Sequence, residues 1–162
     1  MASSRLEKAG SPTGWRRFGF RAPIGLYRVH LGFLLGHRFL MLEHRGRKTG
    51  KTRRTVLEVV ANRPDALYVA AAWREKADWL QNIEADPRVV VHCGFERFDT
   101  TAEIMAPEHA RQVLSGYARE NPRIFARLAR FMLDDPGQTV AENVDRVAST
   151  IPVVKLARPD YR

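Results

Sequence analysis

At residues 46–54 the chain reads Gly46-Arg47-Lys48-Thr49-Gly50-Lys51-Thr52-Arg53-Arg54. The stretch lies between two apolar runs, residues 39–42 and 56–60, and both runs have the composition of strands. It carries five cations and two glycines, and no acid lies between Glu43 and Glu58. The pattern therefore predicts two strands joined by a strongly basic loop.

The composition of this loop predicts an anion site. Gly46 and Gly50 permit a positive φ and a close approach of the backbone, and backbone N–H groups, threonine hydroxyls and fixed cations together bind phosphate or carboxylate. The alternative that stays open is a solvated basic hairpin. Two observations weigh against it, because a plain hairpin turn needs only about two to five residues, and like charges this close repel one another unless an anion lies among them.

Length and composition indicate one domain of 162 residues, enough for a sizeable core. Lys and Arg number 27 against 18 acids, and the formal net charge of +9 suits an anionic cofactor, nucleic acid or an anionic membrane surface. Cys93 is the single cysteine, so no internal disulfide is available and we expect a cytoplasmic setting. No apolar run approaches the ~20 residues of a membrane span, and no signal-peptide core is seen.

The N-terminal part has a distinct character. We expect residues 1–14 to be a disordered tail and residues 15–162 to be a single domain, which begins with an amphipathic segment at 15–36. Pro23 suits the first turn of a helix over about residues 23–35. Aromatic and basic side chains alternate in this segment, so it has two interpretations. In the first interpretation the segment lies on an anionic membrane face. In the second its apolar side packs on the domain or on a partner subunit.

The rest of the chain predicts an α+β pattern. Expected strands cover residues 38–44, 55–61, 66–72, 88–93, 97–105 and 151–157, and expected helices cover residues 74–85, 107–119, 124–132 and 139–149. The spacing of these elements does not determine the topology.

Side chains with catalytic chemistry of their own are scarce. The five histidines are scattered without metal-ligand spacing, so no metal site is predicted. Cys93 lies alone in an expected strand, where a small core residue is the usual role. The chain has neither a G-x-S-x-G elbow nor a Walker loop. No catalytic residue is identified, which suits an enzyme whose cofactor carries the hard step.

Two ordered motifs carry a family resemblance. Residues 46–53 match the pattern G-R-K-[ST]-G-x-x-R, and residues 79–87 match W-[YL]-x-N-[LI]-x-A-x-P. Both resemble motifs of the deazaflavin-dependent nitroreductase family of actinobacteria, and residues 151–156 are similar to the closing strand of that family. The similarity runs from about Arg38 to Arg158, and the ordered pair is more specific than either motif alone.

This resemblance implies a split β-barrel with flanking helices, the fold shared with FMN-binding flavin reductases. It also implies the deazaflavin coenzyme F-420, whose phosphate and polyglutamate tail are anionic. The positions that match the cofactor site of the family are Arg47, Lys48, Thr49, Gly50 and Arg53 for the phosphate, with the basic Arg54 one step outside the motif, Ala70, Ala71 and Ala72 beside the ring, and Trp79 and Asn82. For Trp79 and Asn82 the alternatives are a core aromatic and a helix cap.

Three departures leave the substrate less defined than the cofactor. Val56 stands where the family often has proline, and the linker at residues 71–76 is shorter and bulkier than the usual one. The tyrosines that line the substrate side in better-known members have no clear match, since Tyr117 lies on a helical stripe that is typical of core packing.

We therefore expect an oxidoreductase that passes a hydride from reduced F-420 to an activated alkene, a quinone or a nitro compound. One alternative is an FMN-binding, flavin-reductase-like protein, and another is a non-enzymatic binder of anionic membranes or nucleic acid. The last ranks lowest because no nucleic-acid motif is present. A homodimer and a peripheral position on the inner face of the membrane, through residues 15–36, also stay open.

Overall fold

The computed structural model describes residues 37–71, 77–133, 137 and 139–159. The expected tail at 1–14, the amphipathic segment at 15–36 with its helix, Ala72, and the start of the helix at 74–85 lie outside the described residues.

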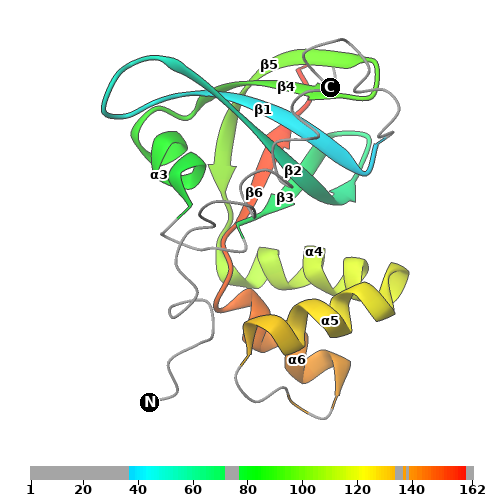
Figure 1. The fold of residues 1–162 in the computed structure, drawn as a ribbon. Helices are drawn as coiled ribbons and strands as arrows, with labels where there is room; N and C mark the ends of the chain where they lie inside the picture. The colour runs from blue at the N-terminus through cyan, green and yellow to red at the C-terminus, as the bar shows by residue number, and fades with distance from the viewer. Residues whose placement is uncertain (1–36, 72–76, 134–136, 138, 160–162) are drawn as a thin grey trace.

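Six antiparallel strands form a closed barrel in the order β1-β2-β3-β6-β5-β4 (Figure 1). β1 closes it by pairing with β2 on one side and with β4 on the other. The strands are β1 (Phe39–Arg45), β2 (Thr52–Asn62), β3 (Ala66–Ala70), β4 (Arg88–Cys93), β5 (Glu96–Ile104) and β6 (Val153–Ala157). The expected α+β pattern is confirmed.

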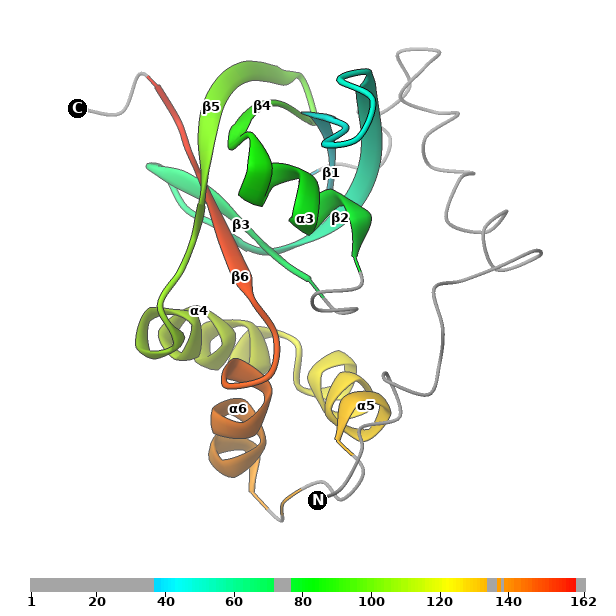
Figure 2. The same ribbon diagram turned by 90° about the vertical axis from the view of Figure 1, so that its left-hand side faces the viewer.

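Alternation along the strands fills the barrel with aliphatic side chains. Leu40 and Leu42 of β1 and Val91 of β4 are fully buried there. Helix α3 (Asp78–Ala85) covers one mouth of the barrel and adds Trp79, Leu80 and Ile83 to this core (Figure 2). The core interpretation of Trp79 therefore describes its packing, since only 8% of the residue is exposed.

A second core lies outside the barrel. Helices α4 (Pro107–Glu120), α5 (Pro122–Met132) and α6 (Val140–Ala148) lie below the barrel (Figure 1) and pack on the outward residues of β2, β3 and β6. Both α4 and α5 begin with proline in the first turn, where its missing N–H costs nothing. Thr139 caps α6, because its hydroxyl accepts a hydrogen bond from Glu142 N at 3.1 Å.

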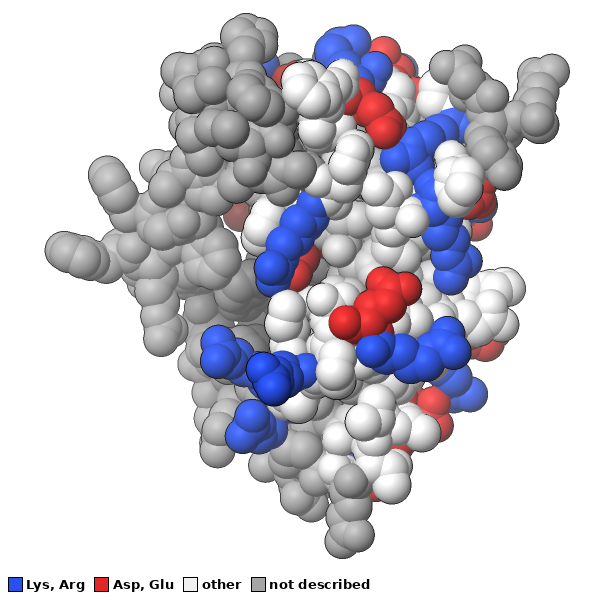
Figure 3. Space-filling view, turned by 90° about the vertical axis from the view of Figure 1, so that its right-hand side faces the viewer, with Lys and Arg blue, Asp and Glu red and all other residues white. Residues whose placement is uncertain are grey.

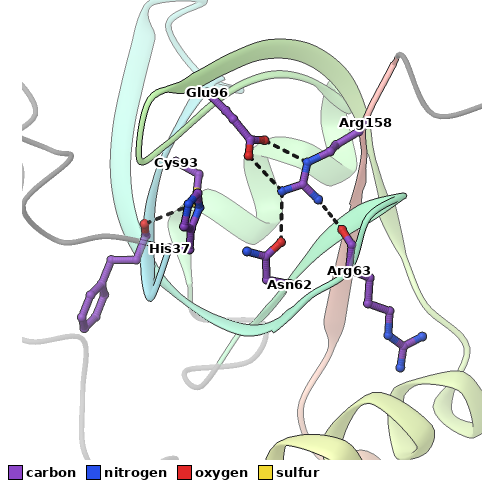
Figure 4. Close-up of polar contacts among 7 residues, drawn as sticks. His37, Asn62, Arg63, Cys93, Glu96 and Arg158 are labelled. Carbon is purple, nitrogen blue, oxygen red and sulfur yellow. Dashed lines mark hydrogen bonds and ion pairs between the residues drawn. The ribbon is translucent and has the colours of Figure 1, made fainter.

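Arg158 ties together the barrel end opposite to α3 (Figure 4). Its Nε donates to Glu96 Oε2 at 2.8 Å and its Nη2 to Asn62 Oδ1 at 3.0 Å, while Nη1 donates to the Arg63 carbonyl. The side chain is only 16% exposed. One residue after β6 thus holds the β2–β3 turn and the start of β5.

The main difference from the expected elements is the start of β2. The strand begins at Thr52, earlier than expected, because Thr52, Arg53 and Arg54 pair with Arg45, His44 and Glu43 of β1. Two of the five cations therefore lie on a strand, and the connecting loop is confined to residues 46–51.

Candidate cofactor site

The loop at residues 46–51 is a closed turn. Gly46 N donates to Lys51 O at 2.9 Å, and Gly50 N donates to Gly46 O at 2.7 Å. Gly50 has a φ of 66°, which strains any residue with a Cβ. A Cβ on Gly46 would lie 3.2 Å from Thr49 Oγ1 and 3.3 Å from Lys51 O. Both glycines are therefore needed for the tightness of the turn.

Of the backbone N–H groups at residues 46–51, only that of Lys48 makes no hydrogen bond to another described residue, so most of the expected cradle of N–H groups is already engaged. Gly46, Thr49 and Gly50 donate to carbonyls of the loop, Arg47 N donates to the Asn82 side chain, and Lys51 N donates to Thr49 Oγ1 at 3.4 Å. The Thr49 hydroxyl keeps its own proton for donation. An anion at this loop is therefore bound mainly by side chains.

Arg47 is directed to helix α3. Its backbone N and its Nη1 both donate to Asn82 Oδ1 at 3.0 Å, and Nη1 also lies 3.2 Å from Asp78 Oδ1. The side chain is 25% exposed. Its charge is thus partly neutralised by Asp78, which sequence reasoning did not single out.

A buried polar pair lies beneath the loop. His44 and Asn82 are the buried polar side chains of the described residues, at 5% and 4% exposure. Asn82 Nδ2 lies 3.1 Å from His44 Nδ1, and His44 Nε2 lies 3.4 Å from Thr55 Oγ1. Burial, aided by the charge of Arg53 and opposed by that of Asp78, lowers the pKa of His44 to about 4. The imidazole is neutral at physiological pH.

Three cations of residues 46–54 have no acidic partner among the described residues. Lys48, Lys51 and Arg53 are exposed, and none makes an ion pair with another described residue. Arg53 pairs in register with His44, so its side chain lies on the face of the hairpin that carries the buried pair. Together with Thr49 these residues fit an anionic group such as a phosphate.

Arg54 lies on the opposite face of β2. Its Nε donates to Glu43 Oε1 at 3.1 Å, and His92 Nε2 lies 3.1 Å from the same oxygen. Beside this cluster an open depression of about 670 Å³ runs over the outer face of β1, β4 and β5; among its lining residues are Glu43, Arg45, Arg88 and Asp99. This region carries acidic and basic side chains side by side. Because Arg54 is ion-paired with Glu43, it does not belong to the cations without an ion-pair partner.

Of the expected ring residues, the two that the structure describes, Ala70 and Ala71, lie on different faces of the barrel wall. Ala70 packs outward against the helical core, whereas Ala71 is 1% exposed and belongs to the core inside the barrel. Ala71 N donates to Pro152 O at 2.9 Å. The predicted contact between these alanines and the ring stays a prediction, and the Ala71 methyl faces the barrel core.

Tyr117 lies where the sequence predicted it, whereas the role of His44 was not predicted. Tyr117 is 5% exposed in the helical core and donates to Glu58 Oε1 at 3.1 Å, as its stripe predicted for a packing role. His44 was missed, although a signal exists. It follows Leu40 and Leu42 at the next inward position of an otherwise apolar strand face.

Within the described ranges, no three His, Cys, Asp or Glu side chains are grouped as metal ligands. None of the described helices has the length and apolar character that crossing a membrane requires.

Solved structures of low sequence identity share this fold. The F420-H2 dependent reductase FDR-A superposes with a TM-score of 0.53 at 19% identity, over 75% of this chain and 95% of its own. A structure described as a domain-swapped dimer gives 0.54 at 18% identity, over 83% and 98%. The haem storage protein HutZ of Vibrio cholerae gives 0.52 at 15% identity, over 84% and 92%. The class of protein is therefore the α+β split β-barrel with flanking helices, as expected.

The family follows from the sequence itself. The sequence profile described as F420H(2)-dependent quinone reductase matches residues 26–130, more than half of the chain, whereas no curated protein matches it. The chain belongs to the F420H2-dependent quinone reductase family. It is an oxidoreductase whose cofactor is coenzyme F-420, and the expected class, cofactor and enzyme type are confirmed.

Proposed function

We propose that this protein reduces a quinone-type acceptor with reduced coenzyme F-420, and that Lys48, Thr49, Lys51 and Arg53 hold the cofactor phosphate. The observation that supports the assignment is the rigid turn at residues 46–51, which presents Lys48 and Lys51 without acidic partners among the described residues. Arg53 adds a third cation from the adjoining strand. The hydrogen-bonded turn fixes the backbone positions of the two lysines, so less conformational freedom is lost when their side chains bind a phosphate.

The chemistry divides between cofactor and protein. When bound, reduced F-420 supplies the hydride, and the acceptor takes up a proton to complete its reduction. The basic residues bind and orient the anionic end of the cofactor and favour negative charge that develops nearby. No side chain is assigned as the proton donor, so we assign the proton to solvent.

The test is a fluorescence titration of the purified protein with F-420 and, separately, with FMN. Lys48→Ala should weaken F-420 binding by about 1.5–3 kcal/mol, the scale of a charge-assisted hydrogen bond, which is roughly ten- to 150-fold. Folding should hardly change because Lys48 is exposed. The matched control is Arg119→Ala, which removes an exposed cation from the last turn of α4.

Two results would count against the assignment. Equal affinity of wild type and the folded Lys48→Ala protein would exclude Lys48 from the site. Tight binding of FMN with no binding of F-420 would favour the flavin-reductase alternative. Turnover of a quinone, a nitroaromatic compound and an enone with reduced F-420 would then rank the three acceptor classes.

We also propose that the protein works in the cytoplasm and touches an anionic membrane surface, where a lipophilic quinone would be reached. Arg123, Arg127 and Arg130 are exposed on one face of α5, which contains no acid. Figure 3 shows basic side chains gathered over this part of the molecule with no acidic side chain between them. Juxtamembrane cations contribute about 1 kcal/mol each at an anionic surface, and residues 15–36 would add the apolar contact.

Sedimentation with vesicles of phosphatidylserine and phosphatidylcholine tests this contact. Replacing the three α5 arginines by glutamine should reduce binding to anionic vesicles about 100-fold, the product of three such increments. The control replaces Arg63, Arg97 and Arg146, which lie elsewhere, and so equalises net charge. Equal loss in both triple variants would show only a dependence on net charge.

A homodimer is the assembly that we propose to test first. The support is a solved structure of the same fold that is described as a domain-swapped dimer. Light scattering after size-exclusion chromatography gives the mass directly.

A further inference from the structure

The hydrogen-bonding capacity of Asn82 is directed into the protein. Its Oδ1 faces two donors, Arg47 N and Arg47 Nη1, each at 3.0 Å. Neither group can accept a hydrogen bond, so the oxygen of the amide must point to Arg47. The Nδ2 group then points to His44 Nδ1 at 3.1 Å. With 4% of the residue exposed, little of this amide is left for a ligand.

The orientation of the amide also determines the state of His44. Because Asn82 Nδ2 is a donor, Nδ1 of the ring must accept, and the ring proton is on Nε2. Nε2 lies 3.4 Å from Thr55 Oγ1. The charged groups around the ring are Arg53 on β2 and Asp78 on α3, and the Arg47 guanidinium reaches Asp78 from the loop. A proton on Nδ1 would place two donors, the Nδ1–H of His44 and the Nδ2–H of Asn82, opposite each other.

The contacts form one continuous chain across the site. The chain of hydrogen bonds begins at Thr55 of β2 and passes through His44 of β1 and Asn82 of α3. It ends at Arg47 of the basic loop. The central two members are buried, and a buried polar group without a partner is costly. The loop position is therefore coupled to the barrel through these two side chains.

We propose that Asn82, supported by His44, is a positioning residue that holds the basic loop in its phosphate-binding shape, and that Arg47 is the anchor of the loop. In this assignment neither Asn82 nor Arg47 is a ligand of the phosphate, which is left to the exposed side chains beyond them. The inference rests on the proposed function, because it deepens the role of the same loop.

The first test compares two ligands in Asn82→Leu, which has neither donor nor acceptor. Affinity for F-420 should fall about tenfold, the equivalent of one lost hydrogen bond of roughly 1.4 kcal/mol. Affinity for the deazaflavin chromophore without the phosphate tail should be unchanged, because the barrel and α3 stay in place. Equal losses for both ligands would overturn a role that acts through the phosphate loop.

A double-mutant cycle separates positioning from contact. Arg47→Ala should lower F-420 affinity less than Asn82→Leu, because the backbone N of residue 47 still donates to Asn82 Oδ1. The double variant should be no weaker than Asn82→Leu, which already releases both contacts. Multiplied losses in the double variant would show that Arg47 binds the phosphate independently of Asn82, and would overturn the proposal.

Asn82→Asp guards against a variant that fails to fold. The introduced carboxylate still accepts from Arg47, and neutral His44 can carry its ring proton on Nδ1 and donate to the carboxylate, while Nε2 accepts from Thr55 Oγ1. Because both contacts are kept, the F-420 affinity of Asn82→Asp should stay closer to that of wild type than the affinity of Asn82→Leu. An equal loss in the folded Asn82→Asp protein would refute a role that acts through these hydrogen bonds. Failure of wild type itself to bind F-420 would instead refute the proposed function.

Discussion

The hydrogen bond between Tyr117 and Glu58 predicts a reversal of relative stability with pH. Burial first, and then the charge and hydrogen bond of Glu58, raise the pKa of Tyr117 from its ordinary value of 10.0 to about 12. Tyr117→Phe removes the phenol but keeps the ring that packs between α4 and β2. Glu58 retains Arg38, whose Nη2 lies 3.6 Å from Glu58 Oε1.

The expected magnitude follows from these contacts. At neutral pH the variant should be less stable by about 1 kcal/mol, the usual net contribution of one hydrogen bond. Above pH 10.0 the unfolded chain releases the phenol proton, whereas the native protein holds it up to about pH 12. Wild type therefore loses about 1.4 kcal/mol of relative stability per pH unit in this range. The two proteins should be equally stable near about pH 11.

Urea unfolding of both proteins between about pH 8 and pH 11.5 measures the difference. Other groups that ionise in this range occur in both proteins and cancel in the comparison. A stability difference that stays constant over the whole range would refute the reasoning, because it would mean that Tyr117 ionises equally in native and unfolded chains.

Three further perturbations test other parts of the molecule. Burial lowers the pKa of His44 from 6.5 to about 4. The stability that the neutral imidazole contributes should be present above pH 6.5 and be lost as the pH falls to 4. In urea unfolding, His44→Gln should therefore lose less free energy of unfolding than wild type over this pH range. Ala71→Leu should lower the free energy of unfolding by about 1–3 kcal/mol through overpacking of the barrel, measured by thermal melting, so that any loss of F-420 affinity comes with lower stability. Arg158→Ala should cost about 1–3 kcal/mol in urea unfolding, because Glu96 and the Arg63 carbonyl lose a charged donor; Arg123→Ala on α5 is the exposed control.

Much of the fold could be predicted from local patterns. The inward leucines of β1, the glycines around the basic loop and Pro107 at the start of α4 are short-range signals, and each lies where the sequence places it, whereas α5 begins at Pro122, two residues before its expected start. The order of strands could not be predicted in this way. It depends on pairings such as β3 with β6, which join residues far apart in the chain.

The candidate site was only partly predictable for the same reason. A count of cations in the loop suggests an anion site, but it does not show which cations are already engaged. Arg47 turns to Asp78 and Arg54 turns to Glu43, and both partners come from other elements. Alternation also separates Ala70 from Ala71, although the two alanines are adjacent in sequence. Resemblance to a motif identifies positions, whereas the direction of each side chain is set by tertiary packing.

The place of β6 in the barrel bears on how the protein is made. β6 comes last among the described strands, yet it lies between β3 and β5 and supplies hydrogen-bonding partners to both. Until β6 has inserted, one edge of β3 and one edge of β5 have no strand partner. Such edges invite pairing with a strand from another copy. The insertion of β6 is thus the folding step before which the protein is most exposed to association with a second copy.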